Sequence, residues 1–153
     1  MRNKLRRMLL NDNQRKLQQI LNVNREINKT FHHLLHKVAT KHGISPVQLF
    51  VLGKLSEHPN IRLSDLAELM YIGNSTMSGI VDRMVRDGYV SRERAETDRR
   101  AMTLNLTDKG RELRKAAEET RITMLEPLLQ LSDEDLREWH RLQQEIIRII
   151  KTI

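Results

Sequence analysis

Short polar and basic side chains recur at helical spacing between residues 75 and 86. At steps of three and four residues they would share one face of a helix. Hydroxyl groups near the start of such a helix can approach base edges or phosphates, and guanidinium groups can bond a phosphate or a guanine. The pattern predicts a helix that enters the major groove of DNA, with a solvated helix face as the ordinary alternative for its arginines. The predicted contact residues are Ser75, Thr76, Ser78, Gly79, Arg83 and Arg86.

Two residues of this segment have more than one interpretation. Gly79 would lie in mid-helix, where glycine costs about 1 kcal/mol relative to alanine. Either DNA or another packed helix approaches the backbone closely at that point. Asp82 is repelled by phosphate, so it either accepts a hydrogen bond from a cytosine amino group or orients a neighbouring arginine.

A second group of charges lies between two segments of alternating polarity, 89–94 and 101–106. Arginine side chains enter narrow minor grooves because the electrostatic potential there is more negative. An aspartate two residues before an arginine can hold the guanidinium in one rotamer, which reduces the entropy lost on binding. We expect Asp98 to position Arg100, Arg100 to insert into the minor groove, and Arg99 to contact the backbone. A solvated turn is the alternative.

The elements that would position these residues are two short helices joined by a tight turn, followed by two strands. Ser64 is a predicted N-cap of the first helix, and Asn74 or Ser75 of the second. Gly73 is expected to supply the positive φ of the turn, and Gly88 to end the second helix. This order is that of a winged helix-turn-helix.

Longer helices are predicted on both sides of this unit. Apolar residues at steps of three and four indicate one helix over 13–41. Ser45-Pro46 then begins another helix, Thr107 caps a further long one, and Ser132 opens the last. Pro127 falls inside the pattern of the third, where we expect a kink or break.

The predicted fold is mainly α with a small β-hairpin wing, in a single domain over 1–153. A winged helix-turn-helix lobe over 45–106 would bind DNA, and the helices over 12–43 and 107–153 would form a dimerisation region. The terminal helices carry more apolar surface than the lobe can cover, and each Leu or Ile that is buried stabilises by about 1.5–3 kcal/mol. We therefore expect a homodimer, the alternative being a monomer whose terminal helices pack on each other.

The formal net charge of +7 comes from one end of the chain. Residues 1–43 carry 10 Lys and Arg against 2 Asp and Glu, whereas the remaining residues carry 17 against 18. Net charge therefore does not mark the helix-turn-helix as basic. The basic start of the chain is interpreted as a helix that extends the dimer surface, with a DNA-contacting arm, a membrane-surface helix and a disordered start as alternatives.

Several classes of function are excluded. The sequence has no cysteine, which excludes a disulfide framework, a thiolate metal site and a thiol redox sensor. No apolar run approaches 18 residues, and a reducing, cytoplasmic setting fits best. His32 and His36 lie one turn apart, but no local third ligand accompanies them, so no metal is expected. No phosphate loop, nucleophile turn or paired carboxylates suggest an enzyme or a cofactor.

The segment from residue 98 to residue 110 resembles the wing and the following helix start of MarR-type regulators, the multiple antibiotic resistance regulator family. The pattern there is Asp-x-Arg, a few residues, then Leu-x-Leu-Thr-x-x-Gly. The matching residues are Asp98, Arg100, Leu104, Leu106, Thr107 and Gly110. Residues 75–90 also resemble the recognition helix of the family and its exit.

The resemblance implies a homodimeric winged-helix transcription factor, often a repressor, on a pseudo-palindromic operator. It further implies a small-molecule effector that enters between the dimer helices and the DNA-binding lobe and weakens DNA binding. Oxidant-sensing members use a cysteine, which this sequence lacks. We expect a sequence-specific DNA-binding transcriptional regulator, a repressor released by a small-molecule effector. The alternative is a winged-helix module that binds a protein partner rather than DNA.

Overall fold

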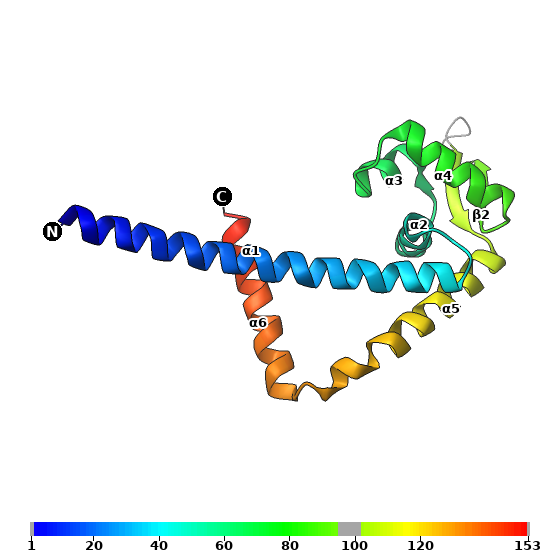
Figure 1. The fold of residues 1–153 in the computed structure, drawn as a ribbon. Coiled ribbons are helices and arrows are strands. Elements are labelled where there is room, and N and C mark those ends of the chain that lie inside the picture. The colour runs from blue at the N-terminus through cyan, green and yellow to red at the C-terminus, as the bar shows by residue number, and fades with distance from the viewer. Residues whose placement is uncertain (1, 95–101, 153) are drawn as a thin grey trace.

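The computed structural model describes the backbone of residues 2–94 and 102–152, and the side chains of residues 11–94 and 102–152. The helices and strands follow one another in the order of a winged helix, which confirms the predicted fold class (Figure 1). The order of elements is α1 (Arg2–Lys41), α2 (Pro46–Glu57), β1 (Ile61–Arg62), α3 (Leu63–Leu69), α4 (Asn74–Arg86), β2 (Val90–Arg94), β3 (Met102–Leu106), α5 (Asp108–Leu125), the 3-10 helix η1 (Glu126–Gln130) and α6 (Asp133–Ile150).

The core lies in a lobe made of α2, α3, α4 and the sheet. The three strands are antiparallel in the order β1-β3-β2, with Ile61 opposite Leu104 and Val90 opposite Leu106. Helices α2, α3 and α4 bury their apolar faces together with β3. The largest fully buried side chains of this lobe are Val51, Leu52, Leu55, Leu66, Met77, Val81, Met84, Val90 and Leu104.

Most of the predicted helix ends are confirmed. Ser45 and Ser132 each close a capping box with the residue three positions later, Gln48 and Asp135. Thr107 caps α5, and the α-helix breaks at Pro127, where η1 replaces it. Helix α1 differs from the prediction because it begins at Arg2 rather than near residue 13.

The helix-turn-helix differs from the sequence predictions in three respects. Ser64 is not an N-cap, because α3 already begins at Leu63. Neither Asn74 nor Ser75 caps α4, because both lie inside the helix and Gly73 precedes it as the N-cap.

Gly73 does not supply the positive φ either, since its φ is −61°. The left-handed residue is Tyr71, with a φ of 54°. The chain reverses immediately after α3, which places the left-handed position two residues before Gly73. Gly73 then enters α4 in an extended conformation.

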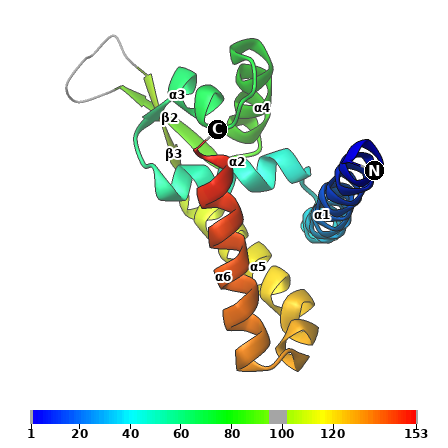
Figure 2. The same ribbon diagram turned by 90° about the vertical axis from the view of Figure 1, so that its left-hand side faces the viewer.

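The helical region extends away from the lobe (Figures 1 and 2). Helix α1 runs outward in one direction, while α5 leads outward in another and α6 turns back after η1. Figure 2 shows α6 and α1 well apart, and the two helices make little contact in the described residues. Leu17 is 61% exposed and Ile150 also 61%, so these apolar stripes are uncovered within one chain. In the described residues the terminal helices therefore do not pack on each other as the monomer alternative required.

Among the described helices, none combines the length and apolar character that crossing a membrane would require.

Candidate nucleic-acid interface

Helix α4 has one buried face and one open face. Met77, Ile80, Val81 and Met84 are buried against the core of the lobe. This burial fixes the rotation of the helix and turns the opposite side outward. Of the residues predicted to contact DNA, four are exposed and two are half-buried on this outer side. The exposed residues are Ser75, Thr76, Arg83 and Arg86, and the half-buried residues are Ser78 and Gly79.

Gly79 has free space where its side chain would be. A Cβ added there would meet no described atom within 4 Å beyond the adjoining turns of its own helix. Close packing of another helix of the same chain, which was one interpretation of this glycine, is therefore not observed. The Gly79 carbonyl accepts a hydrogen bond from Nε of Arg83 at 3.1 Å. This bond holds the Arg83 side chain along the open face of α4.

Asp82 orients an arginine, as one of its two interpretations proposed, but the arginine comes from another element. Arg92 on β2 donates from Nη2 to Oδ1 of Asp82 at 2.6 Å. Sequence reasoning missed Arg92. The signal was available, because side chains alternate along a strand and Arg92 follows the buried Val90 by two residues. Arg92 therefore points to the same side of the sheet as Val90.

The predicted wing residues lie outside the described residues: Asp98, which would position Arg100, Arg100 itself, which would enter the minor groove, and Arg99, which would contact the backbone. The described strands reach the pair formed by Arg94 and Met102. The roles of the three residues remain predictions from the sequence.

The start of α5 is bound tightly to the end of α4. The hydroxyl of Thr107 donates to the Gly88 carbonyl at 2.6 Å and accepts from the Gly110 N–H at 3.0 Å. A Cβ on Gly110 would lie 2.1 Å from the Tyr89 carbonyl oxygen, so only glycine permits this approach. Thr107 and Gly110 therefore set the angle between α4 and α5. This structural role requires no contact between either residue and DNA.

Lys109 adds a further link between the same two helices. Its Nζ donates to the Asp87 carbonyl at 2.7 Å and lies 4.6 Å from the centre of the Tyr89 ring. The ammonium group thereby satisfies a carbonyl at the C-terminal end of α4, where a positive charge is favourable.

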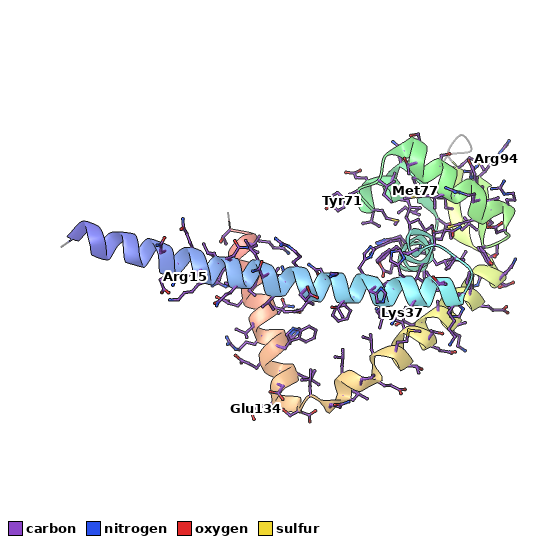
Figure 3. The ribbon with its side chains drawn as sticks, in the orientation of Figure 1. Arg15, Lys37, Tyr71, Met77, Arg94 and Glu134 are labelled. Carbon is purple, nitrogen blue, oxygen red and sulfur yellow. The ribbon has the colours of Figure 1, made fainter. Side chains whose placement is uncertain are left out.

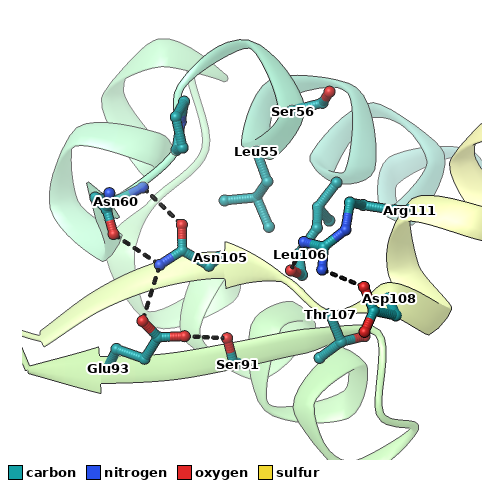
Figure 4. Close-up of a pocket in the computed structure, with 11 residues that line it drawn as sticks. Leu55, Ser56, Asn60, Ser91, Glu93, Asn105, Leu106, Thr107, Asp108 and Arg111 are labelled. Carbon is teal, nitrogen blue, oxygen red and sulfur yellow. Dashed lines mark hydrogen bonds and ion pairs between the residues drawn. The ribbon is translucent and has the colours of Figure 1, made fainter.

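A polar pocket of about 580 Å³ lies on the side of the sheet opposite Arg92 (Figure 4). Asn105 is at its centre and donates from Nδ2 to Asn60 at 2.7 Å and to Glu93 at 3.4 Å. The Asn60 N–H donates to Asn105 Oδ1 at 2.9 Å, and Ser91 donates to Glu93 at 2.8 Å. These bonds join β2 and β3 to the residue that precedes β1, and they hold Asn60 in its left-handed conformation, with a φ of 60°.

Comparison with known proteins points to one family. The model of the MarR family matches residues 44–102. The HTH-type transcriptional repressor MdtR of Bacillus subtilis is 37% identical over 70 residues, which are 46% of this chain and 45% of that protein. The organic hydroperoxide resistance transcriptional regulator of the same organism is 29% identical, over 84% of this chain and 82% of its own length.

Solved structures agree with these relatives. The structure of a MarR family protein from Bacillus stearothermophilus superposes with a TM-score of 0.81 and 26% identity. The match covers 90% of this chain and 97% of that one. The apo form of MarR from E. coli has a TM-score of 0.72 at 18% identity, covering 82% and 93%, and shows a likeness of fold.

Proposed function

Since the chain belongs to the MarR family and is a DNA-binding transcriptional regulator, we propose that it acts as a homodimeric repressor on a pseudo-palindromic operator. The observation that carries this proposal is the open face of α4. It presents hydroxyls near its N-terminal end, an unobstructed backbone at Gly79 and a held guanidinium at Arg83. Such a surface is suited to the major groove.

The homodimer is supported by the uncovered apolar surface of the helical region. Members of the family typically bind DNA as dimers. The exposed large apolar side chains of α6 are Trp139, Leu142, Ile146, Ile147, Ile149 and Ile150. With the exposed apolar residues of α1 they form the kind of surface that a second copy of the chain would bury. Two lobes held in this way would present their α4 helices to half-sites about one helical turn apart.

The proposed DNA contacts come from two sources. Ser75, Thr76, Ser78, Gly79, Arg83 and Arg86 are supported by their place on the outer side of α4. Asp98, Arg99 and Arg100 are proposed from the sequence alone, as contacts of the wing.

Repression and its release by a small-molecule effector are inferred more indirectly. The relative MdtR is named a repressor, but its alignment covers less than half of either protein. The other relative is named for organic hydroperoxide resistance, and a thiol route to such a response is closed here because the sequence has no cysteine. We propose instead a non-covalent effector between the lobe and the helical region, and a cytoplasmic setting.

A binding experiment tests the proposal directly. The purified chain is mixed with genomic fragments, the bound fragments are sequenced, and the affinity for the selected site is measured at about 150 mM salt, where non-specific binding is weak. We expect a palindromic site and a preference over a shuffled duplex of at least about 1000-fold. Equal binding to both duplexes would remove the assignment as an operator-specific regulator. Sedimentation of the free protein tests the dimer independently.

A further inference from the structure

Three helices of this chain end in the same hydrogen-bonded motif. After α1, the N–H of Gly43 donates to Thr40 and that of Ile44 to Ala39. After α4, the N–H of Gly88 donates to Val85 and that of Tyr89 to Met84. After α3, the N–H of Tyr71 donates to Glu68 and that of Ile72 to Ala67. Each is a Schellman motif, which places the first residue after the cap in the left-handed region.

The residue in the left-handed position differs among the three motifs. Gly43 and Gly88 have φ values of 69° and 80°, as expected for the residue type that adopts this conformation without steric cost. The third position holds Tyr71, with a φ of 54°. A tyrosine there is strained, because its Cβ crowds the following carbonyl.

The Schellman hydrogen bonds hold Tyr71 in this conformation, but no packing of its side chain within the described chain offsets the strain. The side chain of Tyr71 is 98% exposed, so its ring packs on no other residue. An exposed aromatic ring in a strained conformation is unfavourable in the free protein. The natural compensation is a contact that the ring makes outside the chain.

The position of Tyr71 indicates which contact this is. Tyr71 lies in the turn between α3 and α4, two residues before the N-cap Gly73, and projects from the edge of the lobe (Figure 3). The half-buried Ile72 anchors the turn beneath it. When the N-terminal end of α4 enters a major groove, the sugar-phosphate backbone at the edge of that groove lies beside this turn.

We propose that Tyr71 contacts the DNA backbone beside the half-site that α4 reads. Its hydroxyl donates a hydrogen bond to a phosphate oxygen, and its ring lies against the adjoining deoxyribose. The contact rests on the proposed function. It positions the lobe on the duplex and reads no base.

The test uses Tyr71→Gly and Tyr71→Phe in the full-length protein, with operator affinity and thermal stability measured on each. Tyr71→Gly relieves the strain, so its Tm should equal or exceed that of the wild type. Its operator affinity should nevertheless fall about fivefold or more, as the loss of a hydrogen bond and a ring contact predicts. Tyr71→Phe should lose part of this affinity. The salt dependence should not change in either variant, because the lost contact carries no charge.

Asn60→Gly is the matched control. Among the residues that the structure describes, it replaces the other non-glycine residue with positive φ, on the side of the lobe that holds the polar pocket, and it should leave operator affinity unchanged. Wild-type affinity in Tyr71→Gly would overturn the contact and leave the proposed function intact. So would a shift of Tyr71→Gly from dimer to monomer in sedimentation, since the ring would then face a protein surface. If the wild type itself binds no DNA fragment, the proposed function fails and the contact fails with it.

Discussion

The carboxylate of Asp82 on α4 and the guanidinium of Arg92 on β2 are joined at 2.6 Å. Both side chains are partly exposed, and such ion pairs contribute only about 0–1 kcal/mol to stability. The importance of the pair is therefore geometric. It connects the helix proposed to read the major groove with the strand that leads to the wing, so α4 and β2 are held at a fixed angle.

Removing this connection should weaken operator binding more than it weakens the fold. For Arg92→Ala we expect a change of less than about 1 kcal/mol in the free energy of unfolding. Operator affinity should fall by about 1 kcal/mol or more, because the wing then has to be ordered on binding. Urea unfolding and fluorescence anisotropy measure the two quantities. Lys54→Ala, which removes the exposed pair with Glu57 on α2, is the control and should leave affinity unchanged.

Replacing Gly79 should change the stability of the fold and the affinity for DNA in opposite directions. Gly79→Ala adds a methyl group where the chain leaves open space, so it should stabilise α4 by about 0.5–1 kcal/mol. The same methyl group would occupy the surface that approaches DNA, and operator affinity should fall. Gly53→Ala in α2 is matched to it, because a Cβ at Gly53 also meets nothing within 4 Å. Equal operator affinities for these two variants would show that Gly79 has no role at the groove.

Gly110→Ala should destabilise the fold itself. The new Cβ would lie 2.1 Å from the Tyr89 carbonyl oxygen, which is backbone and must shift. We expect a loss of about 1–3 kcal/mol in the free energy of unfolding, as in other overpacked sites. The Tm of Gly110→Ala, measured by thermal denaturation together with that of Gly53→Ala as the control, tests this expectation. An unchanged Tm for Gly110→Ala would mean that α5 starts further from Tyr89 than the structure shows.

Arg100 is the residue of the wing whose replacement is predicted from the sequence to cause the largest loss of operator affinity. Arg100→Ala should weaken operator binding by about 1–3 kcal/mol and should also flatten its salt dependence. Lys115→Ala removes one positive charge from an exposed site on α5 and serves as the control for net charge. If the two variants bind the operator equally well, Arg100 has no specific contact.

The N-terminal end of α6 should lose stability in acid. Hydrogen bonds from the Ser132 hydroxyl and then from the Ser132 backbone N–H hold the pKa of Asp135 below its ordinary value. Because the folded-state pKa is lowered, the stabilisation is complete above the unfolded-state pKa and is lost as the pH falls through the folded-state value.

The amide chemical shift of Ser132 should therefore titrate with a midpoint below that of an ordinary aspartate. The Ser45 amide offers an internal control, since it donates to the uncharged Gln48 at 2.8 Å in the same type of capping box. A midpoint for Ser132 at the ordinary aspartate value would contradict the bonds to Asp135.

The amino-acid sequence by itself determined the helices, the capping residues of α2, α5 and α6, and the polar face of α4. These features depend on residues within a few positions of one another, so periodicity and cap chemistry reveal them. The break at Pro127 and the caps at Ser45, Thr107 and Ser132 are examples.

Tertiary structure decided the features that depend on contacts between distant segments or on the path of the backbone. Glycine is the usual left-handed residue, so the sequence predicts this conformation at Gly73. The hydrogen bonds after α3 gave that conformation to Tyr71 instead. Likewise, the partner of Asp82 and the close approach of Gly110 to Tyr89 depend on packing between elements. Spacing along the chain carries no record of these pairings, because the free energy that selects them arises only when the lobe is assembled.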